Sequence, residues 1–141
     1  MNTARLALVL LLTVLATALV TGCNDIPPYT EGRAERYEPP QIQLVGPGKE
    51  DLRTSTVIDA PVQHRNEDDL LFVTVPVRGT DNKVLHVQYR ATFFDATGAA
   101  LPGGPTGWFR KTVQPGAWTP LKFNSTTHRA VQWQMELRYA R

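Results

Sequence analysis

Three runs in which apolar and polar residues alternate place the strongest constraint on how this chain can fold. The runs cover residues 69–78, 84–94 and 131–139. The apolar members of the last run are Val131, Trp133, Met135, Leu137 and Tyr139. Since a period of two sends successive side chains to opposite faces of a strand, each run predicts a β-strand with one buried and one solvated face. We find no convincing helical period in the sequence.

Shorter segments and turn signals complete the expected fold. The segments 42–45, 54–59, 108–113 and 119–123 have strand composition, and Gly- and Pro-rich turns separate several of them. We therefore expect an all-β fold, an immunoglobulin-like antiparallel β-sandwich of about seven strands, over residues 49–141. Pro76 lies within one predicted strand and predicts a free edge or a bulge there.

The first 22 residues have the pattern of a lipoprotein signal peptide. Arg5 precedes an apolar run from Leu6 to Val20, which ends in Leu19-Val20-Thr21-Gly22-Cys23. This ending resembles a bacterial lipobox, in which an aliphatic residue and small residues precede the acceptor cysteine. Cys23 is the single cysteine, so lipidation also explains a thiol that cannot form an intramolecular disulfide. We expect Cys23 to carry diacylglycerol and an N-acyl group such as palmitate, with no other cofactor.

The alternative is an uncleaved membrane helix from Leu6 to Cys23. About fifteen apolar residues span roughly 22 Å as a helix, which is less than the hydrocarbon core of roughly 30 Å. A cleaved leader is therefore favoured. Asn24, in place of an aspartate, favours sorting to the inner leaflet of the outer membrane, with the domain facing the periplasm. Asp25 keeps the inner membrane as the alternative location.

Residues 23–48 are expected to form the lipidated cysteine and a disordered tether. Two Pro-Pro pairs and alternating charges dominate residues 24–40, where aliphatic residues are rare. Proline-rich segments favour an extended conformation of about 3.1 Å per residue, so such a tether reaches roughly 50 Å. The domain could then lie well away from its membrane.

Several motifs of the predicted domain resemble a known family. They are Arg65-Asn66, Leu70 to Arg78, Gln88-Tyr89-Arg90, Phe93-Phe94-Asp95 with Gly98, Trp108, and Ala130 to Arg138. Together they resemble the YcfL-like family of small Gram-negative lipoproteins over most of residues 54–138. The resemblance implies a lipidated periplasmic β-sandwich with no assigned enzymatic activity. The tether is longer and richer in proline than this resemblance implies.

The sequence offers little for catalysis or metal binding. The three histidines lie far apart, without carboxylates at ligand spacing: His64, His86 and His128. Neither Ser55 nor Ser125 lies in a Gly-x-Ser-x-Gly motif. The acidic run 67–69 lacks the spacing of a calcium loop and predicts a hairpin turn. We therefore expect neither an enzyme nor a metal site.

Outward-facing polar and aromatic residues form the candidate interaction surface. They are Gln88, Arg90, Gln134 and Arg138 on predicted strands, with Trp108 and Trp118 in or beside loops. The alternatives are a merely solvated sheet face and tryptophans that close the ends of the core.

The expected function is that of a membrane-anchored adaptor that binds an envelope protein. A peptidoglycan- or carbohydrate-binding module is the alternative, with tryptophans stacking on sugars. Exposed strand edges are also compatible with a homodimer, in which two copies pair edge to edge. Lys and Arg total 15 against 13 Asp and Glu, for a formal net charge of +2, and they are scattered along the chain, so we expect no nucleic-acid partner.

Overall fold

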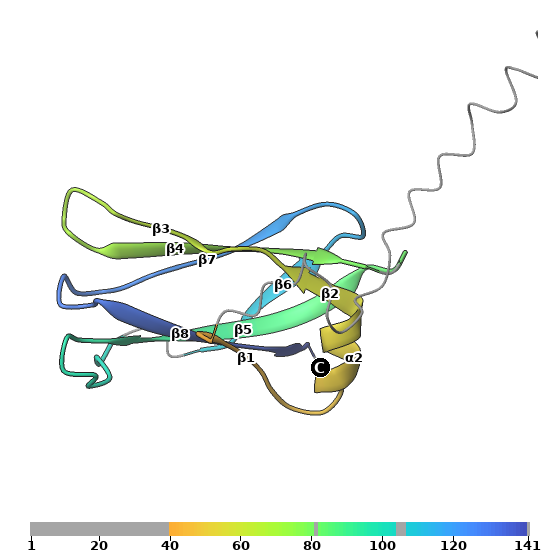
Figure 1. Cartoon of the computed structure of the whole chain (residues 1–141), viewed down its shortest axis with the longest axis horizontal. Coiled ribbons are helices and arrows are strands. Elements are labelled where there is room, and N and C mark those ends of the chain that lie inside the picture. Colours follow the sequence, from red (N-terminus) through yellow and green to blue (C-terminus); the bar gives the residue numbers. More distant parts are fainter. Residues whose placement is uncertain (1–39, 81, 104–106, 141) are drawn as a thin grey trace, which may run out of the picture.

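The computed structural model describes residues 40–80, 82–103 and 107–140, so the predicted signal peptide, Cys23 and most of the predicted tether lie outside it. Within the described residues, eight strands and one helix form two packed layers (Figure 1). None of the described helical segments is long and apolar enough to cross a membrane. In chain order the elements are β1 (Ile42–Leu44), α2 (Lys49–Ser55), β2 (Thr56–Ile58), β3 (Val62–Arg65), β4 (Leu71–Gly79), β5 (Leu85–Phe94), β6 (Phe109–Val113), β7 (Thr119–Asn124) and β8 (Gln132–Tyr139).

The two sheets have the connectivity of a sandwich. Sheet A has the strand order β1-β8-β5-β6. Sheet B has β4 at its centre, with β7 on one side and both β2 and β3 on the other. The chain crosses between sheets from β4 to β5, from β6 to β7 and from β7 to β8, as it does in immunoglobulin-like sandwiches. The predicted all-β sandwich is confirmed.

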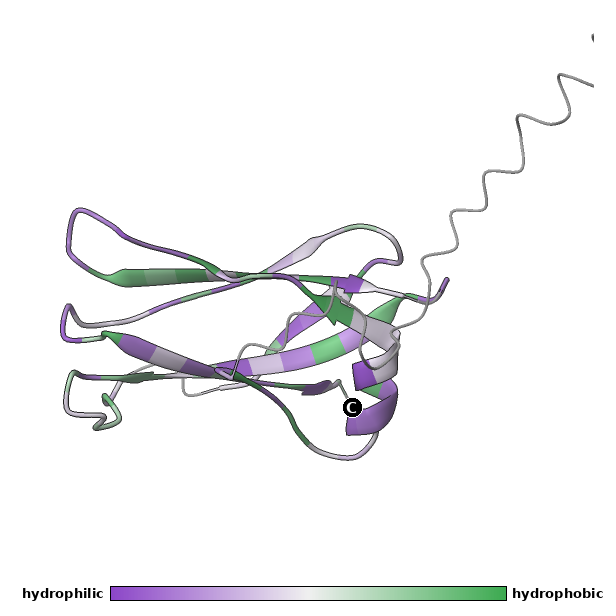
Figure 2. Cartoon of the chain, viewed as in Figure 1, coloured by the Kyte–Doolittle hydropathy of each residue, from purple (hydrophilic) through white to green (hydrophobic). Residues whose placement is uncertain are grey.

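The three alternating runs form the long strands β4, β5 and β8, and their apolar faces make the core. Figure 2 shows β4 largely in the hydrophobic colour and polar segments along β8. Aromatic contacts join the sheets, since Trp133 of β8 meets Phe123 of β7 edge-on at 5.4 Å between ring centroids. The buried apolar residues of these strands are Leu71, Val73, Val75, Val77, Leu85, Val87, Tyr89, Ala91, Phe93, Trp133, Met135 and Leu137.

Strand β1 departs from the expected arrangement in two ways. It pairs with β8 in parallel, with Ile42 opposite Met135 and Leu44 opposite Leu137, so sheet A is mixed and not purely antiparallel. It also lies inside the range 23–48 assigned to the tether, although its sequence indicates a strand. Ile42 and Leu44 pack against the core, so the folded domain begins before residue 49.

Helix α2 was not expected from the sequence. It has seven residues and only one buried side chain, Leu52, so its sequence shows no helical period of apolar residues. A helix this short is not stable alone, and the full burial of Leu52 holds it against the sandwich. Gly48 precedes it with a φ of +76°, a conformation that glycine adopts without strain. The helix also replaces the first part of the strand predicted over 54–59.

Pro76 lies in the central strand of sheet B and not on a free edge. Its neighbour on one side is Pro120 of β7, and on the other side lies the break between β2 and β3. The Pro76 carbonyl accepts a hydrogen bond from the Asp59 amide at 3.0 Å within that break. The proline therefore coincides with an interruption in the partner strand, where a missing N–H costs least.

Two acidic segments form turns. The predicted hairpin turn is confirmed, because residues 66–70 connect β3 to β4. After β5, the Asp95 carboxylate accepts hydrogen bonds from Thr97 and from the Ala99 amide, and Arg129 pairs with it at 3.0 Å. These bonds, that from the Thr97 hydroxyl most of all, lower the pKa of Asp95 below its usual value.

The role of Leu52 predicts a stability effect. Leu52→Ala should lower the free energy of unfolding by about 2–5 kcal/mol, because it removes a fully buried side chain and leaves a cavity. Urea denaturation followed by circular dichroism measures this loss. Exposed Lys49→Ala in the same helix is the matched control, with an expected change within about 0.5 kcal/mol. Equal effects of the two substitutions would contradict the anchoring role of Leu52.

Candidate interaction surface

The outer face of sheet A carries polar side chains from adjoining strands. The register of β5 and β8 places Gln88 opposite Arg138, Arg90 opposite Glu136 and Thr92 opposite Gln134. On the other side of β5, Arg110 of β6 lies opposite Gln88. Opposite residues of an antiparallel pair share a face, so these side chains form continuous rows across the strands.

Trp108 lies over this face immediately before β6. The guanidinium carbon of Arg138 is 3.7 Å from the centre of its ring, and that of Arg90 is 4.9 Å away. Arginine stacks favourably on the face of an indole, through both charge and planar shape. Trp108 is half-buried by these contacts and does not close the end of the core.

Hydrogen bonds fix the two arginines that contact Trp108. Arg138 Nε donates to Gln88 Oε1 at 3.0 Å, and Gln88 is buried with only 8% of its surface exposed. Arg90 forms an ion pair with Glu136, and the hydrogen bond within this pair raises the pKa of Arg90 further above its usual value. The tryptophan and both guanidinium groups are therefore held in place before any ligand arrives. We call Trp108, Gln88, Arg90, Gln134 and Arg138 the clamp surface.

Trp118 lies elsewhere, although the sequence suggested a single surface. It comes directly before β7, and the guanidinium carbon of Arg78 of β4 is 4.9 Å from its ring centre. Both residues belong to the outer face of sheet B. Trp118 remains 46% exposed, so it does not close the end of the core either. Five of the six predicted surface residues thus share a face, and Trp118 does not.

Two charged residues of this face, Arg110 and Glu136, were not among the predicted ones. Arg110 extends the Gln88 row, and Glu136 provides the carboxylate that pairs with Arg90. The sequence signal for Arg110 is its spacing of two from Trp108, which assigns both to one face of a strand. Pairing between strands is not visible in the sequence, so the partner of Arg90 could not be recognised.

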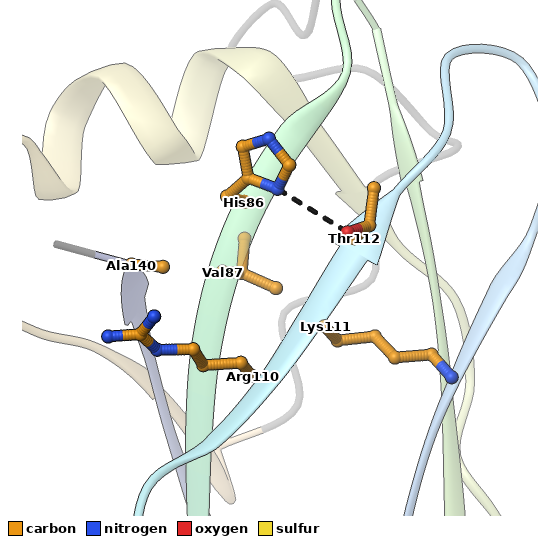
Figure 3. A pocket seen from close by; sticks show the side chains of 6 residues that line it. All are labelled: His86, Val87, Arg110, Lys111, Thr112 and Ala140. Atoms are coloured by element: carbon orange, nitrogen blue, oxygen red, sulfur yellow. Dashed lines mark hydrogen bonds between the residues drawn. The ribbon is translucent and has the colours of Figure 1, made fainter.

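A shallow open hollow of about 640 Å³ borders this face at the β5–β6 pair (Figure 3). Arg110 and Lys111 extend to opposite sides of β6, and His86 Nδ1 lies 3.3 Å from the Thr112 hydroxyl. The described residues that line it bring basic side chains and no carboxylate. Arg110 and Lys111 among them would attract an anionic group.

The three histidines lie on different elements in the described part of the chain. His64 stacks on Phe72 in sheet B, His86 lies in sheet A, and His128 lies in the loop before β8. No three His, Cys, Asp or Glu side chains of the described residues gather as a metal site. The buried Ser125 hydroxyl donates to the Thr127 carbonyl and accepts from the Leu71 amide.

Comparison with known proteins finds one family match and two solved structures of similar fold. Residues 48–139 match the model of a family described as protein of unknown function, DUF1425. The crystal structure of Campylobacter jejuni cj0090 is similar at a TM-score of 0.58 and 17% identity, covering 71% of this chain and 98% of that chain. A DUF1425 family member from Shewanella sp. pv-4 gives a TM-score of 0.54 at 17% identity, covering 61% and 79%. No curated protein matches the sequence.

The clamp surface predicts an energetic coupling. A double-mutant cycle of Trp108→Ala and Arg138→Ala should give a coupling free energy of about 0.5–2 kcal/mol, because each substitution removes the same stacking contact. Urea denaturation of the four proteins measures it. The matched control cycle combines Trp118→Ala with Arg138→Ala, which lie on different sheets and should be additive within about 0.5 kcal/mol. Additivity in both cycles would rule out the stacking.

Proposed function

The chain belongs to the DUF1425 family of proteins of unknown function, and we propose that it is a non-enzymatic binding module of the bacterial cell envelope. The module is anchored through lipid on Cys23 and recognises an envelope protein partner through the clamp surface. It interacts with the membrane through this lipid anchor.

One observation carries this proposal, which is the prearranged cluster around Trp108. Two guanidinium groups stack on its ring, and both are tied to other side chains of sheet A. Tryptophan and arginine are the residues that most often dominate binding energy at protein interfaces. A cluster that is already ordered loses little side-chain entropy when a partner binds.

The location follows from the N-terminal residues, which lie outside the described part of the chain. A signal peptide over residues 1–22, a lipidated Cys23 and the following tether would present the sandwich to the periplasm. We further propose that the chain is similar to the YcfL-like lipoproteins, on the motifs described above. Asn24 favours the inner leaflet of the outer membrane as the final site.

A peptidoglycan- or carbohydrate-binding role is the second candidate. It is favoured by a half-buried tryptophan on a face that also carries Gln88, Gln134 and arginines, because sugars stack on indoles and bond to amides. Titration with muropeptides separates the two roles. Quenching of tryptophan fluorescence that disappears in Trp108→Ala would support sugar binding, and no change at millimolar ligand would leave the protein-binding role.

The anchor predicts a change in mass and location. Wild-type protein should carry the mass of its acyl chains and fractionate with the outer membrane, whereas Cys23→Ala should lack both. Intact-mass spectrometry and membrane fractionation measure the two properties. Equal behaviour of both proteins would contradict lipidation at Cys23 and favour an uncleaved helix.

The clamp surface predicts position-specific crosslinking in cells. A photoreactive amino acid at Gln134 should form one dominant adduct with an envelope protein, because this position adjoins the cluster on the outer face of sheet A. The matched control is the same amino acid at exposed Lys122 on the outer face of sheet B. Trp108→Ala should abolish the Gln134 adduct. Identical adducts at both positions, or none at Gln134, would contradict the proposal.

A further inference from the structure

The edge strands of the two sheets differ in how well they could pair with an additional strand. Within the described residues, β1 and β2 have three residues each and β3 has four, so they offer short edges. The two remaining edge strands are β6 of sheet A and β7 of sheet B. An exposed edge with unpaired backbone groups is the surface on which an extended peptide can add as a further strand.

Strand β7 is blocked at its second residue. Pro120 lies opposite Pro76, and neither residue has an N–H. The two cannot form a hydrogen-bonded pair, so the backbone of Pro120 is directed toward the free edge of β7. That edge therefore lacks a donor at the position where an added strand would need one.

Strand β6 has a usable edge. The Ala140 amide donates to the His86 carbonyl at 2.8 Å, so the backbone groups of His86 are directed toward β8. His86 and its β6 partner Thr112 are then a non-hydrogen-bonded pair, and the same alternation holds for Gln88 and Arg110. The N–H and C=O groups of Arg110 and Thr112 therefore face the free edge, on a strand without proline.

The side chains of β6 indicate what could pair there. Arg110 and Lys111 are consecutive, so one cation lies on each face of the strand (Figure 3). The Lys111 ammonium forms no ion pair with a carboxylate of the described residues, and Phe109 on the same face is 45% exposed. The hollow beside β5 and β6 adds His86 and no described carboxylate.

Charge complementarity selects the occupant. Two copies of this chain could pair through antiparallel β6 strands with Arg110 opposite Arg110, or with Lys111 opposite Lys111. Either pairing would place like charges directly opposite each other, which is destabilising. An acidic strand would place opposite charges there on both of its faces.

We propose that the β6 edge binds an extended acidic segment of a partner protein, which adds to sheet A as an antiparallel strand. The geometry defines its order from N- to C-terminus as acid, acid, apolar, facing Lys111, Arg110 and Phe109 in turn. This inference rests on the proposed function, because it names the partner chemistry of the same module.

A capped hexapeptide tests strand addition, with the sequence threonine-valine-glutamate-glutamate-valine-threonine. The full chain, purified in nonionic detergent, should bind it, and binding should slow hydrogen exchange at the amides of Arg110 and Thr112. The matched control peptide replaces both glutamates with lysine and should not bind. Equal binding of the two peptides, or no binding of the acidic one at low millimolar concentration, would overturn the proposal.

Backbone methylation distinguishes strand addition from a simple charge contact. When the two glutamates lie opposite Lys111 and Arg110, the amide of the fourth peptide residue faces β6 and that of the third faces away. N-methylation at the fourth residue should abolish binding, whereas N-methylation at the third should retain it. Equal effects of the two methyl groups would overturn the strand geometry. This test requires no variant of the protein.

Charge variants locate the site on the protein. Lys111→Glu should weaken binding of the acidic peptide roughly fivefold or more, as expected for loss of a cross-strand ion pair, and should reduce the preference for the acidic peptide over the lysine peptide. Lys122→Glu on β7 is the matched control and should leave affinity unchanged. Equal loss in both variants, or binding of anionic lipid vesicles with the same Lys111 dependence in place of the peptide, would overturn the assignment to a peptide strand.

The two proposals can fail separately. Crosslinks from Gln134 without peptide binding would retain the clamp surface and remove strand addition. Peptide binding at β6 without Gln134 crosslinks would retain the edge site and remove the clamp surface as the place of recognition.

Discussion

The antiparallel pairing of β5 with β8 is the interaction on which the rest of the structure depends. Its register puts Phe93 beside Trp133 and Ala91 beside Met135 on the inner face, where they build the core. The same register puts Gln88 beside Arg138 on the outer face. A slip of one residue would exchange the two faces and expose the core residues to water. Core formation and the polar surface therefore follow from one choice of register.

Much of the fold was predictable because alternation depends on local sequence. The long strands and their buried faces were evident, since burial of one face imposes a period of two over β4, β5 and β8. Strand β1 and helix α2 were harder for a physical reason. Each depends on one or two side chains, such as Ile42 and Leu52, that become buried only when distant parts of the chain meet them.

The candidate surface was predictable to the same extent and for the same reason. The alternation of side chains along each strand assigned four residues to outward faces, and the pairing of the strands brought them together: Gln88, Arg90, Gln134 and Arg138. Trp118 was assigned to the wrong sheet because alternation assigns a face only to residues within a strand. The sheet beside which a loop residue lies depends on how the chain crosses between the two layers. The stacking of Arg138 on Trp108 likewise joins β8 to the residue before β6, which sequence spacing cannot indicate.

The basic residues of sheet A fall into two groups with different consequences. Arg90 and Arg138 are committed to Glu136, Gln88 and Trp108, so their charge is ordered and partly neutralised. Lys111, on the inner side of β6, has no such commitment among the described side chains. Cations on an edge strand discourage pairing between identical copies, which protects a sheet from aggregation. The same charges cannot discourage an acidic strand, because they attract it. An edge protected in this way against its own copies is therefore selective for a partner of opposite charge.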